Sequence, residues 1–292
     1  MYSQLANKYF RHLSPFIAQN LKRILVHPRY YRSLYIGRKQ LKKYKNVYKH
    51  HLLFLAGLPK SGTTWLENML ASYPGFVPIL PSRVTKYEME HKSSIEYDLP
   101  EDFFEPLRNG LFVIKMHIYG SKHNVAVLKK NNIRYCLLYR DLRDAAVSHC
   151  FYVRATPWHP ESQEYRRYDI KGCLKIFCLK RLDEWVNWLK TWRENRDREQ
   201  SIEVTYEKLL TDTFGTLKKI AQFFELDDSD KTLYSIIEKN KFSQLKKKDS
   251  VFFRKGLSGD WRNYFDEEIK KEFKEKAGEL LKELGYEKNL DW

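Results

Sequence analysis

A short segment near residue 60 has the composition of a phosphate-binding loop. It reads GLPKSGTT from Gly57 to Thr64 and lies between an apolar run, residues 52–57, and a segment with apolar residues at helical spacing. The first backbone N–H groups of a helix have no partner within the helix, and the helix dipole adds positive potential at that end. Both effects favour a bound anion. The candidate phosphate ligands here are Lys60, Ser61, Gly62, Thr63 and Thr64.

The segment departs at one position from the triphosphate-binding pattern, GxxxxGK followed by serine or threonine. Thr63 stands where that pattern has its lysine, and Lys60 lies inside the loop instead. A kinase needs the lysine on the β- and γ-phosphates and the next hydroxyl on magnesium. The departure argues against an ATP- and magnesium-dependent phosphotransferase, which stays an alternative beside an ordinary glycine turn. Lys60 is suited to offset charge that develops on a departing phosphate oxygen.

A histidine ends another apolar run. His117 is the last residue of LFVIKMH, residues 111–117, and Lys115 precedes it by two positions. The unperturbed pKa of histidine is about 6.5, so an imidazole at a strand end can take a proton from a hydroxyl at neutral pH. The chain has nine histidines, and the usual role of each is in packing or at the surface. His117 is the candidate general base.

An arginine and a serine follow a third apolar run at a spacing that suits a second anion. Arg140 comes directly after residues 133–139, and Ser148 lies two turns into the helix predicted next. Both side chains would then face the carboxyl edge of a parallel sheet. The planar fork of arginine and the neutral hydroxyl of serine are a suitable pair for a phosphate dianion. The alternative is an ion pair of Arg140 with Asp141 or Asp144.

These residues need a sheet whose strand ends meet at one edge. Apolar runs predict strands over residues 52–57, 111–117, 133–139 and 202–205. Helical spacing predicts helices over residues 63–72, 141–153, 171–193, 214–224, 231–239 and 267–284. The stretches predicted to be loops over the site are residues 74–108 and 152–170. The alternation predicts an α/β fold of P-loop type, with three layers and a central parallel β-sheet flanked by helices.

Three strings together resemble the cytosolic sulfotransferase family. They are PKSGTTW, residues 59–65, YRDLRDAAVS, residues 139–148, and RKGLSGDW, residues 254–261. In that family they bind the donor 3'-phosphoadenosine 5'-phosphosulfate (PAPS). The resemblance implies an enzyme that transfers a sulfonate group from PAPS to an acceptor hydroxyl, releases adenosine 3',5'-bisphosphate (PAP) and uses no metal.

The resemblance also implies a role for each matching residue. His117 is the implied base, Lys60 stabilises the leaving phosphate, and Lys115 contacts the sulfonate oxygens. Related carbohydrate-modifying sulfotransferases use a glutamate as base, so Glu88 or Glu90 is the alternative. Asn240 departs from the family, which usually has threonine at that position. The implied nucleotide contacts are Lys60, Ser61, Gly62, Thr63, Thr64, Trp65, Arg140, Ser148, Tyr206, Asn240, Phe242, Arg254, Lys255 and Gly256.

The net charge of +16 is concentrated at the N-terminus. Residues 1–50 hold twelve lysines and arginines and no acid, and we expect them to form a basic arm beside one domain over residues 51–292. Ile17, Leu21 and Ile24 stand at helical spacing among these cations, as in a helix on anionic lipid. A peripheral membrane contact is therefore one interpretation, beside a solvated extension, a helix packed on the domain or an organelle presequence. The positive charge leaves a nucleic-acid-binding protein as an alternative. Outside the arm, however, the basic residues match no nucleic-acid recognition motif, so no nucleic-acid partner is expected.

Composition bears on the acceptor and on the compartment. Aromatic residues make up 15% of the chain and are frequent in the predicted loops, which favours a lipophilic alcohol or phenol as acceptor. The four cysteines form no CxxC pair, and no apolar run approaches the roughly 20 residues that span a bilayer. We expect a cytoplasmic protein without disulfides.

Overall fold

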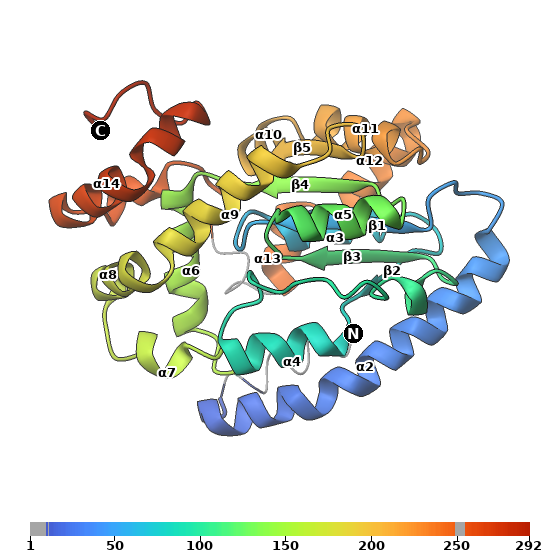
Figure 1. The fold of residues 1–292 in the computed structure, drawn as a ribbon, viewed down its shortest axis with the longest axis horizontal. Helices are drawn as coiled ribbons and strands as arrows, with labels where there is room; N and C mark the ends of the chain where they lie inside the picture. The colour runs from blue at the N-terminus through green and yellow to red at the C-terminus, as the bar shows by residue number, and fades with distance from the viewer. Residues whose placement is uncertain (1–9, 11, 249–254) are drawn as a thin grey trace.

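Five parallel strands form the central sheet, in the order β2-β3-β1-β4-β5 (Figure 1). The structure is a computed structural model that describes residues 10, 12–248 and 255–292. The strands are β1 (Leu52–Gly57), β2 (Val77–Ile79), β3 (Phe112–Met116), β4 (Tyr135–Tyr139) and β5 (Ser201–Thr205). Because all five run in the same direction, the segments after β1, β3 and β4 leave the sheet at one edge. The parallel sheet confirms the predicted fold class.

Helices surround this sheet, and their predicted positions are largely confirmed. They are α2 (Pro15–Tyr44), α3 (Thr63–Leu70), α4 (Ser82–His91), α5 (Lys122–Lys130), α6 (Leu142–Arg154), α7 (Ser162–Tyr165), α8 (Ile170–Lys180), α9 (Leu182–Asn195), α10 (Tyr206–Thr211), α11 (Thr213–Phe223), α12 (Asp230–Lys239), α13 (Phe242–Lys248) and α14 (Glu267–Glu283), with short 3-10 turns η1 (Glu105–Leu107) and η2 (Asp260–Asn263). The ends of α3, α6, α11, α12 and α14 lie within two residues of the predicted ones.

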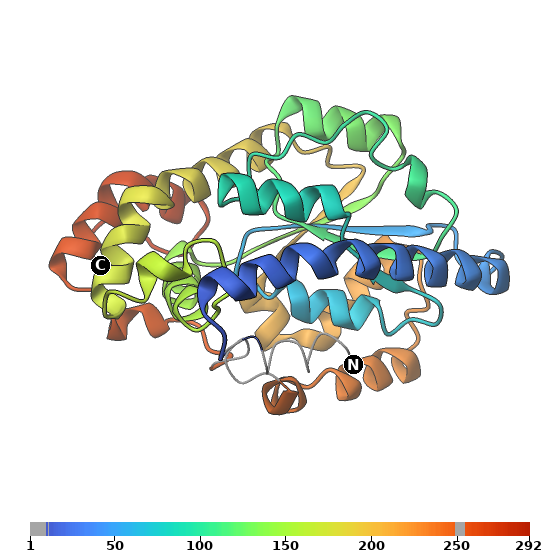
Figure 2. The same cartoon turned by 90° about the horizontal axis from the view of Figure 1, so that it is seen from below.

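The two faces of the sheet carry separate apolar cores. Side chains alternate along a strand, so Phe54 and Ala56 of β1 point to one face and Leu53 and Leu55 to the other. All four are fully buried, as a central parallel strand requires. Figure 2 shows the sheet between α5 (green) on one side and α3 (light blue) on the other. The sheet is therefore the middle of three layers.

Several parts of the secondary-structure prediction were wrong. The predicted loop over residues 74–108 contains β2 and α4, and the one over residues 152–170 contains α7. β2 escaped detection because it has three residues and includes Pro78, which only an edge strand tolerates. The single helix predicted over residues 171–193 is two helices, α8 and α9, that meet at Arg181. α5 was not predicted.

The N-terminal arm contains a 30-residue helix, α2, which runs beside α4 and β2 (Figure 1). Ser14 caps it, and Pro15 suits its first turn because the missing N–H has no acceptor there. Gly37 allows a close approach to the sheet, since a Cβ there would lie 2.0 Å from the Phe112 ring. For residues 15–44 the structure thus shows a helix packed on the domain.

The outward side of α2 carries apolar residues in an otherwise basic segment. Ile24, Tyr31 and Tyr35 are 66%, 62% and 68% exposed. Lipid binding by this side stays a prediction. Among the described residues no helix is long and apolar enough to cross a membrane, and the four cysteines are buried free thiols.

Candidate active site

The loop between β1 and α3 has a backbone shape that suits a bound anion. Lys60 has a φ of 66°, and Gly62, the N-cap of α3, has a φ of 81°. A Cβ at Gly62 would lie 2.7 Å from the Tyr206 ring, so glycine is needed for both the positive φ and the close approach. The first N–H groups of α3, at Thr63 and Thr64, have no acceptor inside the helix. These N–H groups and the dipole of α3 favour an anion in front of the helix.

Two buried polar atoms in the predicted site have no hydrogen-bond partner among the described residues. One is Oγ of Ser61, a fully buried residue, and the other is Nε of Arg140, which is 8% exposed. A buried polar group without a partner costs about 1–3 kcal/mol. Anions that accept from these atoms would remove the cost. The residues present therefore fit a ligand with phosphate groups.

Lys60 and Lys115 both line the cavity at this loop. Lys60 Nζ lies 3.8 Å from the centre of the Tyr152 ring. Lys115, on β3, donates to Thr64 Oγ1 at 2.9 Å and to Glu67 Oε2 at 3.1 Å. Lys115 is therefore tied to α3 by a carboxylate, whereas Lys60 presents its ammonium beside an aromatic ring.

His117 directly follows β3 and lines the same cavity. Its Nδ1 lies 2.5 Å from the carbonyl oxygen of Gly57, at the end of β1. Because a carbonyl oxygen can only accept, Nδ1 carries the proton and the lone pair is on Nε2. The pKa of His117 is lowered to about 4, chiefly by burial. The hydrogen bond to Gly57 opposes this shift, and the charge of Lys115 adds to it. The imidazole is neutral at physiological pH, with a nitrogen that can accept a proton.

Arg140 comes directly after β4, and its guanidinium lies over the Tyr206 ring, 4.3 Å from Cζ to the ring centre. Its Nη2 donates to Leu257 O at 2.6 Å and lies 3.5 Å from Asp144 Oδ2. The alternative ion pair with Asp144 thus exists, but it is buried rather than at the surface. Arg140, Ser148 and Tyr206 all line the cavity, so the structure brings these predicted residues together.

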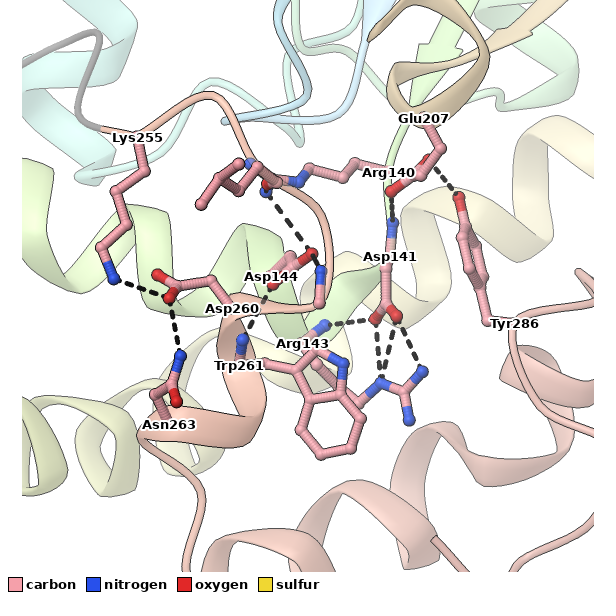
Figure 3. A network of polar contacts seen from close by, with 12 residues as sticks. Arg140, Asp141, Arg143, Asp144, Glu207, Lys255, Asp260, Trp261, Asn263 and Tyr286 are labelled. Atoms are coloured by element: carbon pink, nitrogen blue, oxygen red, sulfur yellow. Dashed lines mark hydrogen bonds and ion pairs between the residues drawn. The ribbon is translucent and has the colours of Figure 1, made fainter. Parts of the chain in front are cut away.

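The C-terminal string is fastened to the start of α6 (Figure 3). Asp144 accepts from the backbone N–H of Gly259 at 2.6 Å and from that of Trp261 at 2.9 Å. Arg143 packs on the Trp261 ring, 4.1 Å from Cζ to the ring centre, and its Nη2 donates to Asp141 Oδ2 at 2.7 Å. The GDW part of the string therefore positions the RKG part. The hydrogen bonds of Asp144 to this string were not predicted from the sequence.

Lys255 and Gly256 line the cavity, as the resemblance implied. Lys255 Nζ donates to Asp260 Oδ1 at 2.7 Å, also visible in Figure 3, and this partner raises the pKa of Lys255. Gly256 has a φ of 66°, which favours glycine. Arg254 lies outside the described residues.

Trp65 lines the cavity and is held by Asn240. Its Nε1 donates to Asn240 O at 2.9 Å. The side-chain amide of Asn240 donates to Ser72 Oγ at 3.0 Å and to Ile236 O at 2.8 Å, so both of its N–H groups are used inside the protein. The structure thus gives Asn240 a role in positioning Trp65, and its contact with the nucleotide stays a prediction. The side chain of Phe242 lies outside the described part of the chain.

The cavity, of about 240 Å³, also contains side chains that sequence analysis missed. They come from the segment after α4, from α6, from the residues around α7 and from the start of α9, and include Ser93, His149, His159, Glu161, Arg181 and Glu184. Most are polar or charged, and neither their spacing nor their types form a recognisable motif. Only their burial in the folded chain distinguishes them from surface charges.

Of the two glutamates considered as a base, only Glu88 lines the cavity. It lies 3.3 Å from Lys22 Nζ on α2. Burial raises the pKa of Glu88, but the Lys22 ammonium helps to bring it below its usual value, so the side chain is a carboxylate. Glu90 is exposed, with its Oε1 3.8 Å from Lys86 Nζ.

The chain is similar to known proteins of one family. The family described as Sulfotransferase domain matches residues 50–285. Sulfotransferase 2A1 of Macaca fascicularis is 26% identical over 268 residues, which cover 82% of this chain and 88% of that protein. The human Sulfotransferase 2A1 is 26% identical over 256 residues, which cover 77% and 84%.

Solved structures share the fold. Mouse sulfotransferase SULT7A1 complexed with PAP has a TM-score of 0.61 at 22% identity, over 86% of this chain and 95% of that one. Retinol dehydratase in complex with androsterone and PAP has a TM-score of 0.58 at 20% identity, over 84% and 86%. The family match spans most of the chain and includes the loop at Lys60, His117 and Arg140. The chain therefore belongs to the sulfotransferase family and is a sulfotransferase.

Proposed function

We propose that this sulfotransferase moves the sulfonate group of PAPS to a hydroxyl of a small-molecule acceptor in one in-line step. PAPS supplies the sulfonate: the acceptor oxygen bonds to sulfur, the bond from sulfur to the phosphate oxygen breaks, and PAP leaves. The acceptor proton passes to Nε2 of His117. Holding the reacting groups in line supplies much of the rate enhancement.

Two anion sites would hold the nucleotide. The first turn of α3 with Lys60 and Ser61 suits the 5'-phosphate, and Arg140 with Ser148 suits the 3'-phosphate. The observation that carries this assignment is the pair of buried, unpartnered atoms, Ser61 Oγ and Arg140 Nε. PAP in the similar structures supports the same ligand here. Lys255 and Gly256 would complete the 3' site.

His117 is the proposed base because its Nδ1–H is held by Gly57 and its lone pair is on Nε2. Lys60 would stabilise the charge that develops on the leaving phosphate oxygen. Glu88 is the second candidate, since it lines the same cavity as a carboxylate. The two candidates differ in their expected effects on the rate, as described in the Discussion.

We expect the acid limb of the pH profile to lie well below that of an ordinary histidine. The pKa of His117 is lowered to about 4, so its base form should predominate where an unperturbed imidazole, with a pKa of about 6.5, is half protonated. kcat/KM for the acceptor, which reports the free enzyme, should therefore be flat between about pH 5.5 and 7. Circular dichroism at each pH controls for unfolding. A midpoint near 6.5 would contradict the neutral His117 described above.

A thermal-shift comparison tests the donor assignment. PAP, ATP with magnesium and a short oligonucleotide are each added to the full chain at concentrations up to the millimolar range. A ligand at 100 times its Kd stabilises the native state by about 2.7 kcal/mol, so PAP should raise Tm by several degrees. A rise with ATP and magnesium alone would favour a phosphotransferase, and one with the oligonucleotide alone a nucleic-acid-binding protein. No rise with PAP would refute the proposal.

A further inference from the structure

A line of ring contacts leads from the phosphate loop to a buried polar group. The Lys60 ammonium lies on the Tyr152 ring, whose centre is 5.8 Å from that of His159. The ring of His159 lies 5.7 Å from that of His149, and His149 Nε2 is 3.7 Å from Glu161 Oε2. All of these residues line the cavity that contains His117. The group is therefore part of the space in which an acceptor must bind.

Arg181 joins two carboxylates in this group. Its Nε and Nη2 donate to Glu161 Oε1 at 3.0 and 2.9 Å, and its Nη1 donates to Glu184 Oε2 at 3.1 Å. Nη2 also donates to the carbonyl oxygen of Lys92 at 3.0 Å. Arg181 stands at the junction of α8 and α9, where the predicted single helix is interrupted. The break between α8 and α9 is therefore at a charged residue whose side chain lines the cavity.

The group has more free hydrogen-bond acceptors than donors. The guanidinium of Arg181 is occupied by Glu161, Glu184 and a carbonyl, whereas each carboxylate keeps unused lone pairs. His149 is 6% exposed, and its Nε2 has no hydrogen-bond partner in the described part of the chain, because 3.7 Å to Glu161 is too long. Two carboxylates against one guanidinium also leave an excess of negative charge.

Both histidines of the group are neutral. Burial lowers the pKa of His159 to about 3, and burial also lowers that of His149. The backbone N–H of Glu161 donates to His159 Nδ1 at 3.3 Å, so the hydrogen of that imidazole is on Nε2. Although burial raises the pKa of Glu161, the Arg181 guanidinium beside it helps to bring that pKa down to about 2, so this side chain is ionised.

We propose that this acceptor cluster, formed by His149, His159, Glu161, Arg181 and Glu184, binds a neutral polyhydroxylated acceptor of the saccharide class. The proposal rests on the proposed sulfonate transfer and names its acceptor. A hydroxyl both donates and accepts, so several hydroxyls on one molecule can satisfy the carboxylate lone pairs, His149 Nε2 and the N–H of His159 together. One further hydroxyl faces His117, gives it its proton and receives the sulfonate.

Other acceptor classes fit the cluster less well. A phenol or a steroid has one or two hydroxyls and would place apolar surface on buried carboxylates, which is unfavourable when their hydrogen bonds to water are not replaced. The lipophilic acceptor that the aromatic content favoured is therefore not the class that this cavity wall selects.

The test measures transfer from radiolabelled PAPS to a panel of methyl glycosides and disaccharides, with p-nitrophenol and a hydroxysteroid for comparison. The best glycoside should exceed both aromatic and steroid acceptors in kcat/KM by about tenfold or more, the effect of about one hydrogen bond to a charged group. Glu184→Gln should lower glycoside kcat/KM by about 10- to 100-fold by the same reasoning. Glu194→Gln, at an exposed position of the same helix, is the matched control and should be unaffected. Isothermal titration should give the same Kd for PAP in all three proteins.

Several outcomes would overturn the acceptor class without touching the donor site. One is faster transfer to p-nitrophenol or the steroid than to every glycoside, and another is full glycoside transfer by Glu184→Gln. Binding of the glycosides to the complex with PAP is followed in parallel by saturation-transfer NMR, and an absence of binding across the panel also overturns it. A wild-type protein that binds no PAP would instead defeat the proposed function.

Discussion

Replacing His117 with alanine should lower kcat by about 10²- to 10⁴-fold, the usual contribution of a positioned general base. The Kd for PAP should change little, because the anion sites at Ser61 and Arg140 remain. His117→Asn is the sharper variant: its side-chain amide can keep a hydrogen bond to the Gly57 carbonyl but has no nitrogen that takes a proton. It should be as slow as the alanine variant. Single-turnover rates and titration with PAP measure the two quantities.

Glu88→Gln separates the two candidate bases. If His117 takes the proton, the glutamine variant should keep a far larger part of the rate than either His117 variant. Glutamine preserves the shape of the side chain and a contact with Lys22, but it loses the carboxylate. Near-normal rates in both His117 variants, combined with a large loss in Glu88→Gln, would assign the base to Glu88.

Arg140→Ala should weaken PAP binding by about 10- to 150-fold, which corresponds to about 1.5–3 kcal/mol for hydrogen bonds to a charged group. The rate at saturating PAPS should fall much less. The fold should survive, because the ion-pair partner Asp144 still accepts from the N–H groups of Gly259 and Trp261. Isothermal titration with PAP measures the effect.

Two further variants make the Arg140 result specific. Arg140→Lys keeps the charge and loses the planar fork, so its Kd should lie between those of the wild type and the alanine variant. Arg193→Ala removes an arginine on the outer side of α9, with its nearest carboxylate 3.6 Å away at Glu283, and should leave the Kd unchanged. An unchanged Kd for Arg140→Ala would remove this residue from the proposed 3'-phosphate site.

The donor side of the site was predictable because each of its parts lies within one short segment of the chain. The apolar run of β1, the glycine turn and the helix start occupy one short segment, and the segments ending at His117 and Arg140 each follow a strand. Parallel strands bring such ends to one edge of a sheet. Their types and spacing therefore predicted the positions of Lys60, His117 and Arg140 before any tertiary contact was known.

The acceptor side was not predictable in the same way. Arg181 and Glu184 have the i, i+3 spacing of an ordinary surface ion pair, and Glu161 lies 20 residues before Arg181. Periodicity across residues 171–193 suggested one continuous helix, so the junction at Arg181 was invisible. Asn240 is a further case, because tertiary packing uses both N–H groups of its amide, which the local string does not reveal.

Helix α2 lies outside residues 50–285, where the family match falls, yet it touches the acceptor side twice. Lys22 pairs with Glu88, and Gln19 Nε2 donates to the carbonyl oxygen of His159 at 3.1 Å. A helix that the family match does not include thus supports two parts of the cavity wall, at Glu88 and at His159. Substitutions in α2 are therefore expected to reach the cavity through these two contacts.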